Sequence, residues 1–166
     1  YVAEPGWPFY YSLYQQMSPA VLAAQQPDGH WYTSLKDPAH GPVGETSGSA
    51  LFVYAMAWGV RNGALDPYMY WPAVENGWRG ILTRVDQDGG VSFVQPFGEA
   101  PQVFDAQSRE TYGTGAVLMA GAEIARNLGV AAQVDPAPLL QEAHALVPDA
   151  PNLSNECEDN NCDAPD

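Results

Sequence analysis

The chain has 166 residues, 46% of them hydrophobic and 11% aromatic, and 20 acidic against six basic residues give it a net charge of −14. This length and apolar content suffice for one domain with a sizeable core. The excess negative charge disfavours binding to nucleic acid, which is itself a polyanion, and no apolar run reaches the roughly 20 residues of a membrane-spanning helix.

Four helices are predicted from apolar residues that recur every three or four positions. Their expected ranges are 9–25, 45–62, 67–84 and 110–128. Pro19 lies inside the first range and is expected to kink or break that helix. Gly63 is expected to cap the second helix at its C-terminus. An Asp-Gly turn and a short extended piece follow the first and the third helix, and the extended pieces are 31–35 and 91–94.

The rest of the chain is expected to begin a third helix pair near 136–146 and then to fade into a flexible acidic tail. This gives one helical domain over residues 1–148 and a tail over 149–166. Cys157 and Cys162 lie five apart in the tail. One interpretation is a small disulfide loop, which would favour a secreted or periplasmic protein over a cytoplasmic one. A zinc site would need two further ligands, and the tail holds no histidine.

The start of the helix at Glu45 is repeated 65 residues later at Glu110. The two stretches read E-T-S-G-S-A and E-T-Y-G-T-G-A, and the Asp-Gly turns before them lie 60 residues apart. Thr46 or Ser47 is expected to accept a hydrogen bond from the first free backbone N–H groups, while Glu45 and Glu110 place negative charge at the positive helix end. The small residues that follow would let a neighbouring helix approach closely. We therefore expect two equivalent inner helices of one repeated unit.

The repeated unit is a helical hairpin with an Asp-Gly turn and an extended loop. Such a hairpin cannot bury its apolar faces alone and needs neighbours on both sides. Two and a half hairpins make an open arc. The sequence therefore predicts an all-α protein with the alternating inner and outer helices of an (α/α) toroid. Because the chain starts at Tyr1 without Met, we expect it to be a processed, trimmed or partial product.

Several stretches, taken in order, resemble one family of enzymes. They are Q-Q-P-D-G-H-W at 25–31, E-T-S-G-S-A-L-F-V-Y-A at 45–55, G-V-R-N-G at 59–63 and V-D-Q-D-G at 85–89. From about residue 14 to 128 the chain resembles glycoside hydrolase family 105, the unsaturated rhamnogalacturonyl and glucuronyl hydrolases, which is related to family 88. The resemblance implies an (α/α)6 toroid of which this chain is roughly the C-terminal half. The family's catalytic aspartate has no counterpart here, so the catalytic residue is unknown.

The activity implied by the resemblance is removal of a 4,5-unsaturated uronic acid from the non-reducing end of oligosaccharides left by polysaccharide lyases. An aspartate helps to protonate the double bond and to activate water, unlike the two-carboxylate displacement of ordinary glycosidases. No metal or organic cofactor is implied. The expected partners are the unsaturated oligosaccharide and either the missing N-terminal half or another chain.

Six residues are candidates for substrate binding, each with a structural alternative. They are Trp31, His30, Tyr112, Arg109, Glu45 and Glu110. A tryptophan face suits the C–H surface of a sugar, and a histidine can bond a hydroxyl or a carboxylate. The alternative makes Trp31 a core residue and His30 its surface neighbour.

The other four candidates are expected at the inner helix ends that rim the central cavity. Glu45 and Glu110 suit sugar hydroxyl groups, and the alternative for both is helix capping and electrostatics. Tyr112 stands where the first repeat has a serine, and this difference favours a site role. Arg109 suits a uronate carboxylate, and its alternative is an ion pair with Asp105 or Glu110.

Three other functions remain open. The Q-x-x-x-G-x-W pattern at 25–31 also matches triterpene cyclases, although it occurs once and no D-x-D-D motif accompanies it. The chain could instead be a non-catalytic half-barrel fragment that binds a glycan or a partner. It could also belong to another (α/α)-toroid glycosidase or lyase, because one fold supports several chemistries.

Overall fold

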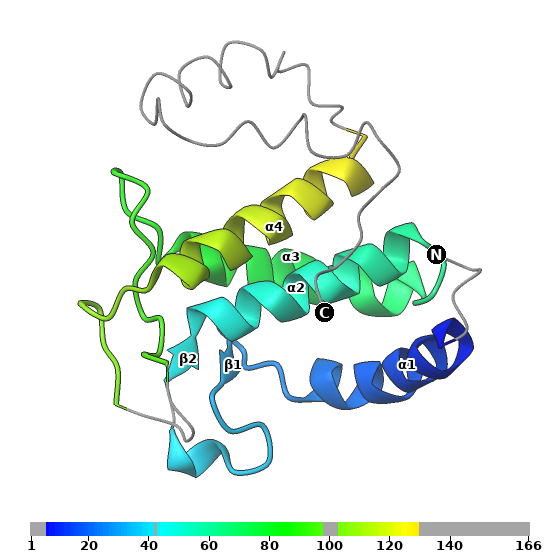
Figure 1. The fold of residues 1–166 in the computed structure, drawn as a ribbon, viewed down its shortest axis with the longest axis horizontal. Coiled ribbons are helices and arrows are strands. Elements are labelled where there is room, and N and C mark those ends of the chain that lie inside the picture. The colour runs from blue at the N-terminus through cyan, green and yellow to red at the C-terminus, as the bar shows by residue number, and fades with distance from the viewer. Residues whose placement is uncertain (1–5, 42, 98–102, 130–166) are drawn as a thin grey trace, which may run out of the picture. The chain divides into compact units, whose positions relative to one another are not determined.

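Four helices dominate the computed structural model, which describes residues 6–41, 43–97 and 103–129. They are α1 (Trp7–Ala23), α2 (Thr46–Arg61), α3 (Pro67–Leu82) and α4 (Thr111–Asn127), with a 3-10 helix at Pro38–His40. Strands β1 (Trp31–Tyr32) and β2 (Gly44–Glu45) pair antiparallel, with Trp31 opposite Glu45 (Figure 1). The four predicted helices are confirmed to within two residues at each end.

Other expectations fall outside the described residues. They are the third helix pair near 136–146, the boundary after residue 148, the acidic tail, and Cys157 with Cys162. The chain divides into two units, Tyr1–Ala131 and Ala132–Asp166, and all described residues lie in the first. Within that described part, no helix is long and apolar enough to cross a membrane.

Pro19 does not break α1, which continues to Ala23. The proline lacks the N–H that would bond the carbonyl of Gln15. Both Pro19 and Gln15 are exposed, so water can reach that carbonyl. Next to the proline, the Ser18 hydroxyl donates to the Tyr14 carbonyl at 2.7 Å. The helix therefore tolerates the proline on its solvent side.

The N-terminus of α2 is capped by Glu45, and the expectation that Thr46 or Ser47 accepts the capping bonds is wrong. The Glu45 carboxylate accepts the N–H groups of Ser47 at 3.2 Å and Gly48 at 2.6 Å. Thr46 is the first helical residue, and its hydroxyl donates to the Ser92 carbonyl at 2.8 Å. At the other end of α2, Gly63 follows the cap residue with φ +69°, which is the predicted glycine stop.

The two Asp-Gly turns have the same backbone structure. In the first, Gln26 donates to the His30 carbonyl at 2.8 Å and Gly29 donates to Gln26 at 2.9 Å. In the second, Asp86 donates to Gly90 at 2.8 Å and Gly89 donates to Asp86 at 3.0 Å. Gly29 and Gly89 have φ values of +89° and +77°, a region that glycine adopts without strain. The repeat predicted from the sequence is therefore present in three dimensions.

The extended pieces are shorter than expected. The first is limited to Trp31–Tyr32, and the second is a single bridge between Val85 and Val91. The reason for the second is local, because Phe93 has φ +57° and turns the chain away from an extended course.

The core is built around α2, which packs most extensively against α4 and α3. Its fully buried apolar residues come from β1, from all three helices and from the loop before α4: Trp31, Ala50, Val53, Ala57, Val74, Ile81, Val94 and Ala120. The small residues at the start of α4 were expected to let a neighbouring helix approach closely, but one of them faces a loop instead. Gly113 admits Val94 of the loop, since a Cβ at Gly113 would lie 2.5 Å from Val94 Cγ2.

Helices α2 and α4 run side by side in the same direction (Figure 1). Toward their C-terminal ends, the Asn127 side chain donates to the Ala57 carbonyl at 3.0 Å, and the buried Glu123 pairs with Arg61. Because the two helices are parallel, their N-terminal ends lie at the same end of the unit. That end holds most of the predicted site residues.

Candidate functional site

The candidate site is the rim formed by the N-terminal ends of α2 and α4 and by the segment Ser92–Phe97 between them. Glu45 and Glu110 occupy the N-cap positions of the two helices. Tyr112 lies in the first turn of α4, and Arg109 precedes it. The structure thus brings these four candidate residues to one end of the helix pair, as the repeat predicts. The other two lie next to Glu45, since Trp31 pairs opposite it and His30 packs against Gly44.

Glu45 is only 7% exposed, and its carboxylate is fully engaged. Besides the two capping amides it accepts the Ser47 hydroxyl at 3.0 Å and the backbone N–H of Gln95 at 3.0 Å. The carboxylate therefore joins the start of α2 to the rim segment. This arrangement favours the structural alternative for Glu45, and direct contact with a sugar stays a prediction.

Glu110 differs from Glu45 although the sequence repeats it. It stands at the N-cap of α4 but makes no side-chain capping bond, and it is half-buried. Capping by side-chain hydrogen bonds therefore does not explain why a glutamate stands at position 110. Its carboxylate keeps the capacity to accept hydrogen bonds from a ligand.

Tyr112 is 45% exposed, and its hydroxyl donates to the backbone carbonyl of Gln95. Burial, followed by the negative charges of Glu110 and Glu45, raises the pKa of Tyr112. The hydroxyl therefore stays protonated and keeps its donor role. Glu45 and Tyr112 thus bind the two backbone polar groups of the same residue from two different helices.

Trp31 is 1% exposed, and both of its N–H groups are paired. Its indole N–H donates to the Val21 carbonyl at 2.7 Å, and its backbone N–H donates to the Ser49 hydroxyl at 2.9 Å. The ring packs against Phe52 with centroids 5.5 Å apart. This burial favours the core alternative, and a role in sugar binding stays a prediction.

His30 is 2% exposed and is not the surface neighbour that the alternative assumed. Two glycines make room for the side chain. A Cβ at Gly44 would lie 2.5 Å from His30 Cβ, and a Cβ at Gly80 would lie 3.1 Å from His30 Cε1. His30 Nδ1 lies 3.4 Å from Asp28 Oδ2, and neither ring nitrogen has a hydrogen-bond partner among the described residues. Burial lowers the pKa of His30, against the opposing charge of Asp28. A neutral, buried imidazole results.

Arg109 pairs with Asp86, and neither of the partners expected for it, Asp105 and Glu110, is the one used. The pair is exposed and joins the end of the long loop to the second Asp-Gly turn. A second cation, Arg84, places its guanidinium carbon 3.6 Å from the ring centroid of Phe93. The rim therefore lies close to two cationic groups in a strongly acidic chain.

Sequence reasoning missed the rim segment itself. Its backbone is bonded at successive residues: Thr46 N–H donates to the Phe93 carbonyl at 3.0 Å, and Val94 N–H donates to Ser108 at 3.1 Å. The threonine that follows each glutamate was a usable signal, since Thr46 is completely buried. No sequence pattern indicated the positive φ of Phe93.

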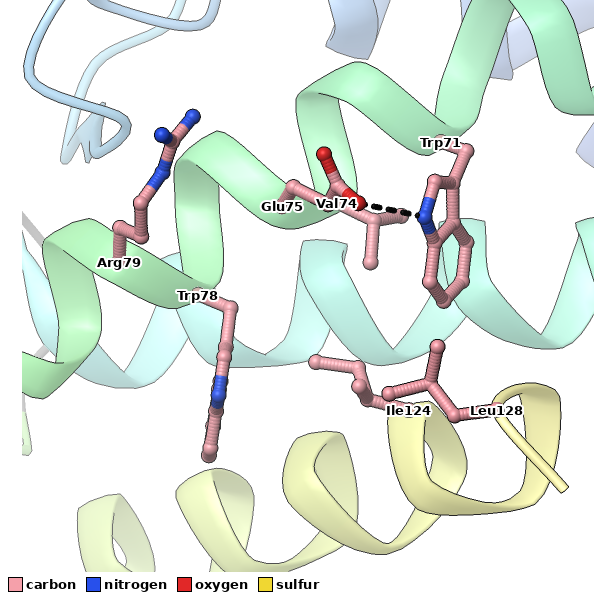
Figure 2. A pocket seen from close by; sticks show the side chains of 7 residues that line it. All are labelled: Trp71, Val74, Glu75, Trp78, Arg79, Ile124 and Leu128. Atoms are coloured by element: carbon pink, nitrogen blue, oxygen red, sulfur yellow. Dashed lines mark hydrogen bonds between the residues drawn. The ribbon is translucent and has the colours of Figure 1, made fainter. Parts of the chain in front are cut away.

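A separate apolar pocket of about 320 Å³ lies between α3 and α4 (Figure 2). Its lining residues are Trp71, Val74, Glu75, Trp78, Arg79, Ile124 and Leu128. The Trp71 indole donates to Glu75 at 2.9 Å. Ile124 follows Tyr112 by 12 residues of α4, which is about 18 Å along a helix. The pocket is therefore remote from the rim, and it gathers none of the six candidates.

A metal-binding role finds no support in the described residues, where no group of three or more histidine, cysteine, aspartate or glutamate side chains lies close enough to share an ion.

Comparisons with known proteins agree on one family. Residues 2–128 match the profile of Glycosyl Hydrolase Family 88. Over 116 residues the chain is 43% identical to an unsaturated 3S-rhamnoglycuronyl hydrolase from Formosa agariphila, covering 70% of this chain and 31% of that protein. A solved glycosyl hydrolase family 88 structure from Bacteroides vulgatus superposes with a TM-score of 0.71 and 40% identity, over 75% of this chain and 37% of that one.

A more distant likeness concerns the fold alone. A structure from Salmonella enterica described as a possible member of the GH105 family gives a TM-score of 0.62 at 24% identity, over 71% of this chain and 32% of that one. These neighbours confirm the predicted all-α class and the (α/α) toroid. The chain spans about a third of the length of the relatives it matches.

Proposed function

Because this chain belongs to Glycosyl Hydrolase Family 88, we propose that the complete protein removes a 4,5-unsaturated uronic acid from the non-reducing end of lyase-generated oligosaccharides. The observation that carries the proposal is the 43% identity to an unsaturated 3S-rhamnoglycuronyl hydrolase. The family match over residues 2–128 includes all four described helices and the described rim.

The proposed reaction hydrates the double bond between C4 and C5 of the uronate. A proton adds to C4, and a water oxygen bonds to C5 while it gives up a proton. The resulting hemiketal opens and releases the next sugar. These steps need one group that both donates and accepts a proton. The aspartate that fills this role in the resembled family has no counterpart in this chain, so the contribution of this chain is substrate binding.

Two rim residues suit direct contact with the substrate. Glu110 offers a carboxylate that makes no capping bond, and Arg109 offers a guanidinium that is about half exposed. A guanidinium and a uronate carboxylate form strong charge-assisted hydrogen bonds. Arg109 is already paired with Asp86, so binding a uronate there means sharing or exchanging that partner.

The test uses the complete protein and an oligosaccharide that ends in a 4,5-unsaturated uronate. Hydration removes the conjugated double bond, so its ultraviolet absorbance is expected to fall as the next sugar is released. The same oligosaccharide with that bond reduced is the control and should give no product. A rise in absorbance on an intact polysaccharide would instead indicate β-elimination, the chemistry of the lyase alternative, and would overturn the proposal.

The non-catalytic alternative applies to the 166-residue chain by itself. It is favoured by the lack of a counterpart to the family's aspartate. We expect this chain alone to leave the absorbance of the unsaturated oligosaccharide unchanged, whereas the complete protein lowers it. Hydrolysis by the isolated chain would show that it holds its own proton donor.

A further inference from the structure

We propose that the rim segment, Ser92–Phe97, binds substrate through Phe97, whose ring packs against the sugar next to the unsaturated uronate. Glu45 and Tyr112 act as positioning residues that hold this segment in place. This inference rests on the proposed function and names residues for one part of it. It also assigns Glu45 and Tyr112 a different task from direct sugar binding.

The position of the segment is set by side chains from two helices. Gln95 donates its N–H to the Glu45 carboxylate at 3.0 Å, and its carbonyl accepts the Tyr112 hydroxyl. Glu45 is at the start of α2, and Tyr112 is in the first turn of α4. Since helix ends are rigid points of attachment, Gln95 is fixed relative to both inner helices.

The bonds continue through the residues before Gln95. The Ser92 carbonyl accepts the Thr46 hydroxyl at 2.8 Å, the Phe93 carbonyl accepts the Thr46 N–H at 3.0 Å, and Val94 donates to Ser108. Phe93 has φ +57°, a conformation that costs energy for a non-glycine residue and persists only where the surroundings impose it. Strained residues of this kind cluster at ligand-binding and active sites, which fits a binding role for this segment.

Pro96 narrows the conformations of the chain that leaves Gln95. Its φ is fixed near −65° by the ring, and a proline restricts the residue before it to extended conformations. Phe97 follows directly and is 95% exposed, so a large apolar ring is presented to solvent next to the anchored residue Gln95.

The chemistry of the ring fits a sugar better than a protein core. An aromatic face offers flat apolar area to the C–H groups of a pyranose, and ligand sites combine such faces with a few placed polar groups. At the rim the polar groups are Glu110 and Arg109, which belong to the same end of α4. A uronate bound by the guanidinium would leave the neighbouring sugar to pack on the ring.

The first experiment compares two exposed aromatic residues in the complete protein. Phe97→Ala is expected to raise KM for the unsaturated oligosaccharide about tenfold with little change in kcat, a loss equivalent to about 1.4 kcal/mol of binding. Tyr68→Ala is the matched control, because Tyr68 is 92% exposed but lies at the start of α3, the end of the hairpin opposite to the rim. Its KM should stay unchanged, and an equal effect of both variants would overturn the inference.

The second experiment tests positioning by a double-mutant cycle. Tyr112→Phe removes only the hydroxyl that holds Gln95, and it is expected to raise KM several-fold. If Tyr112 acts through Phe97, the same substitution should add nothing in a Phe97→Ala background. Independent, multiplicative effects of the two substitutions would mean that Tyr112 contacts the sugar directly, and would overturn its assignment as a positioning residue.

Calorimetric binding of the same oligosaccharide separates this inference from the proposed function. Hydrolysis with normal KM in Phe97→Ala would overturn the inference and keep the function. Binding without hydrolysis, weakened about tenfold by Phe97→Ala, would overturn the function and keep the inference. Neither binding nor hydrolysis by the wild-type protein would overturn both.

Discussion

Replacing Trp31 by phenylalanine separates the two roles predicted for this residue. The indole donates to the Val21 carbonyl at 2.7 Å, and loss of that bond costs about 1–2 kcal/mol at a partly buried site. Phenylalanine is smaller by roughly 40 Å³, which adds about 1 kcal/mol at roughly 24 cal/mol per Å³ of cavity. We therefore expect the free energy of unfolding to fall by about 2–3 kcal/mol.

The assay is urea unfolding of the complete protein, together with KM for the unsaturated oligosaccharide at a temperature where both proteins are folded. A core role predicts lower stability and an unchanged KM for Trp31→Phe. Trp71→Phe is the matched control, because Trp71 also donates its indole N–H, to Glu75, but at an exposed site where water can replace the partner. The control should cost about 1 kcal/mol or less.

The reasoning would be refuted by the opposite pattern. A raised KM for Trp31→Phe with unchanged stability would mean that the ring is available to a sugar. Equal destabilisation by the two tryptophan substitutions would mean that burial does not set the cost.

Three further predictions concern stability. Burial lowers the pKa of His30 below its ordinary value of about 6.5, so the unfolded chain takes up the proton at a higher pH than the folded chain. The stability that the neutral His30 contributes is therefore complete above that pH and is lost as pH falls toward the folded-state pKa. Wild-type Tm should fall more than the Tm of His30→Phe between about pH 6.5 and 5, and parallel curves would contradict this. Gly77→Ala should cost about 1–3 kcal/mol in a chemical-unfolding experiment, because its Cβ would lie 2.5 Å from Val53 Cγ2, while Gly115→Ala, with nothing within 4 Å, should stabilise by about 0.5–1 kcal/mol. Glu123→Gln should lower Tm more than Arg126→Gln, because the buried Glu123 serves both Arg61 and Arg126 whereas Arg126 is 63% exposed; equal shifts would contradict the ranking.

Much of the fold was readable from the sequence because it depends on local signals. Helix periodicity, the Asp-Gly turns and the repeated glutamates act over a few residues, and the structure has each where it was expected. The break considered at Pro19 does not occur, because the effect of a proline depends on which face of α1 meets water, and that is a property of packing. A kink at Pro19 stays a prediction.

The rim was only partly readable because its contacts join distant residues. Glu45 and Glu110 look equivalent in sequence, yet one caps its helix by hydrogen bonds and the other does not. Glu45 also accepts the N–H of Gln95 across 50 positions, a contact that no local sequence pattern indicates. The partner of Arg109 was missed for the same reason, since Asp86 lies 23 residues away.

The bonds of Thr46 to Ser92 and Phe93 also bear on the order in which the protein folds. They join residues 46 and 47 positions apart, whereas the hairpin of α2 and α3 needs only contacts across a short connection. Closing a long loop costs entropy that is recovered only once both sides have formed. The hairpin can therefore form early, but the rim has to wait for α4 and its preceding loop. Partial unfolding that releases α4 would abolish the binding proposed for the rim while most of the helical signal remains.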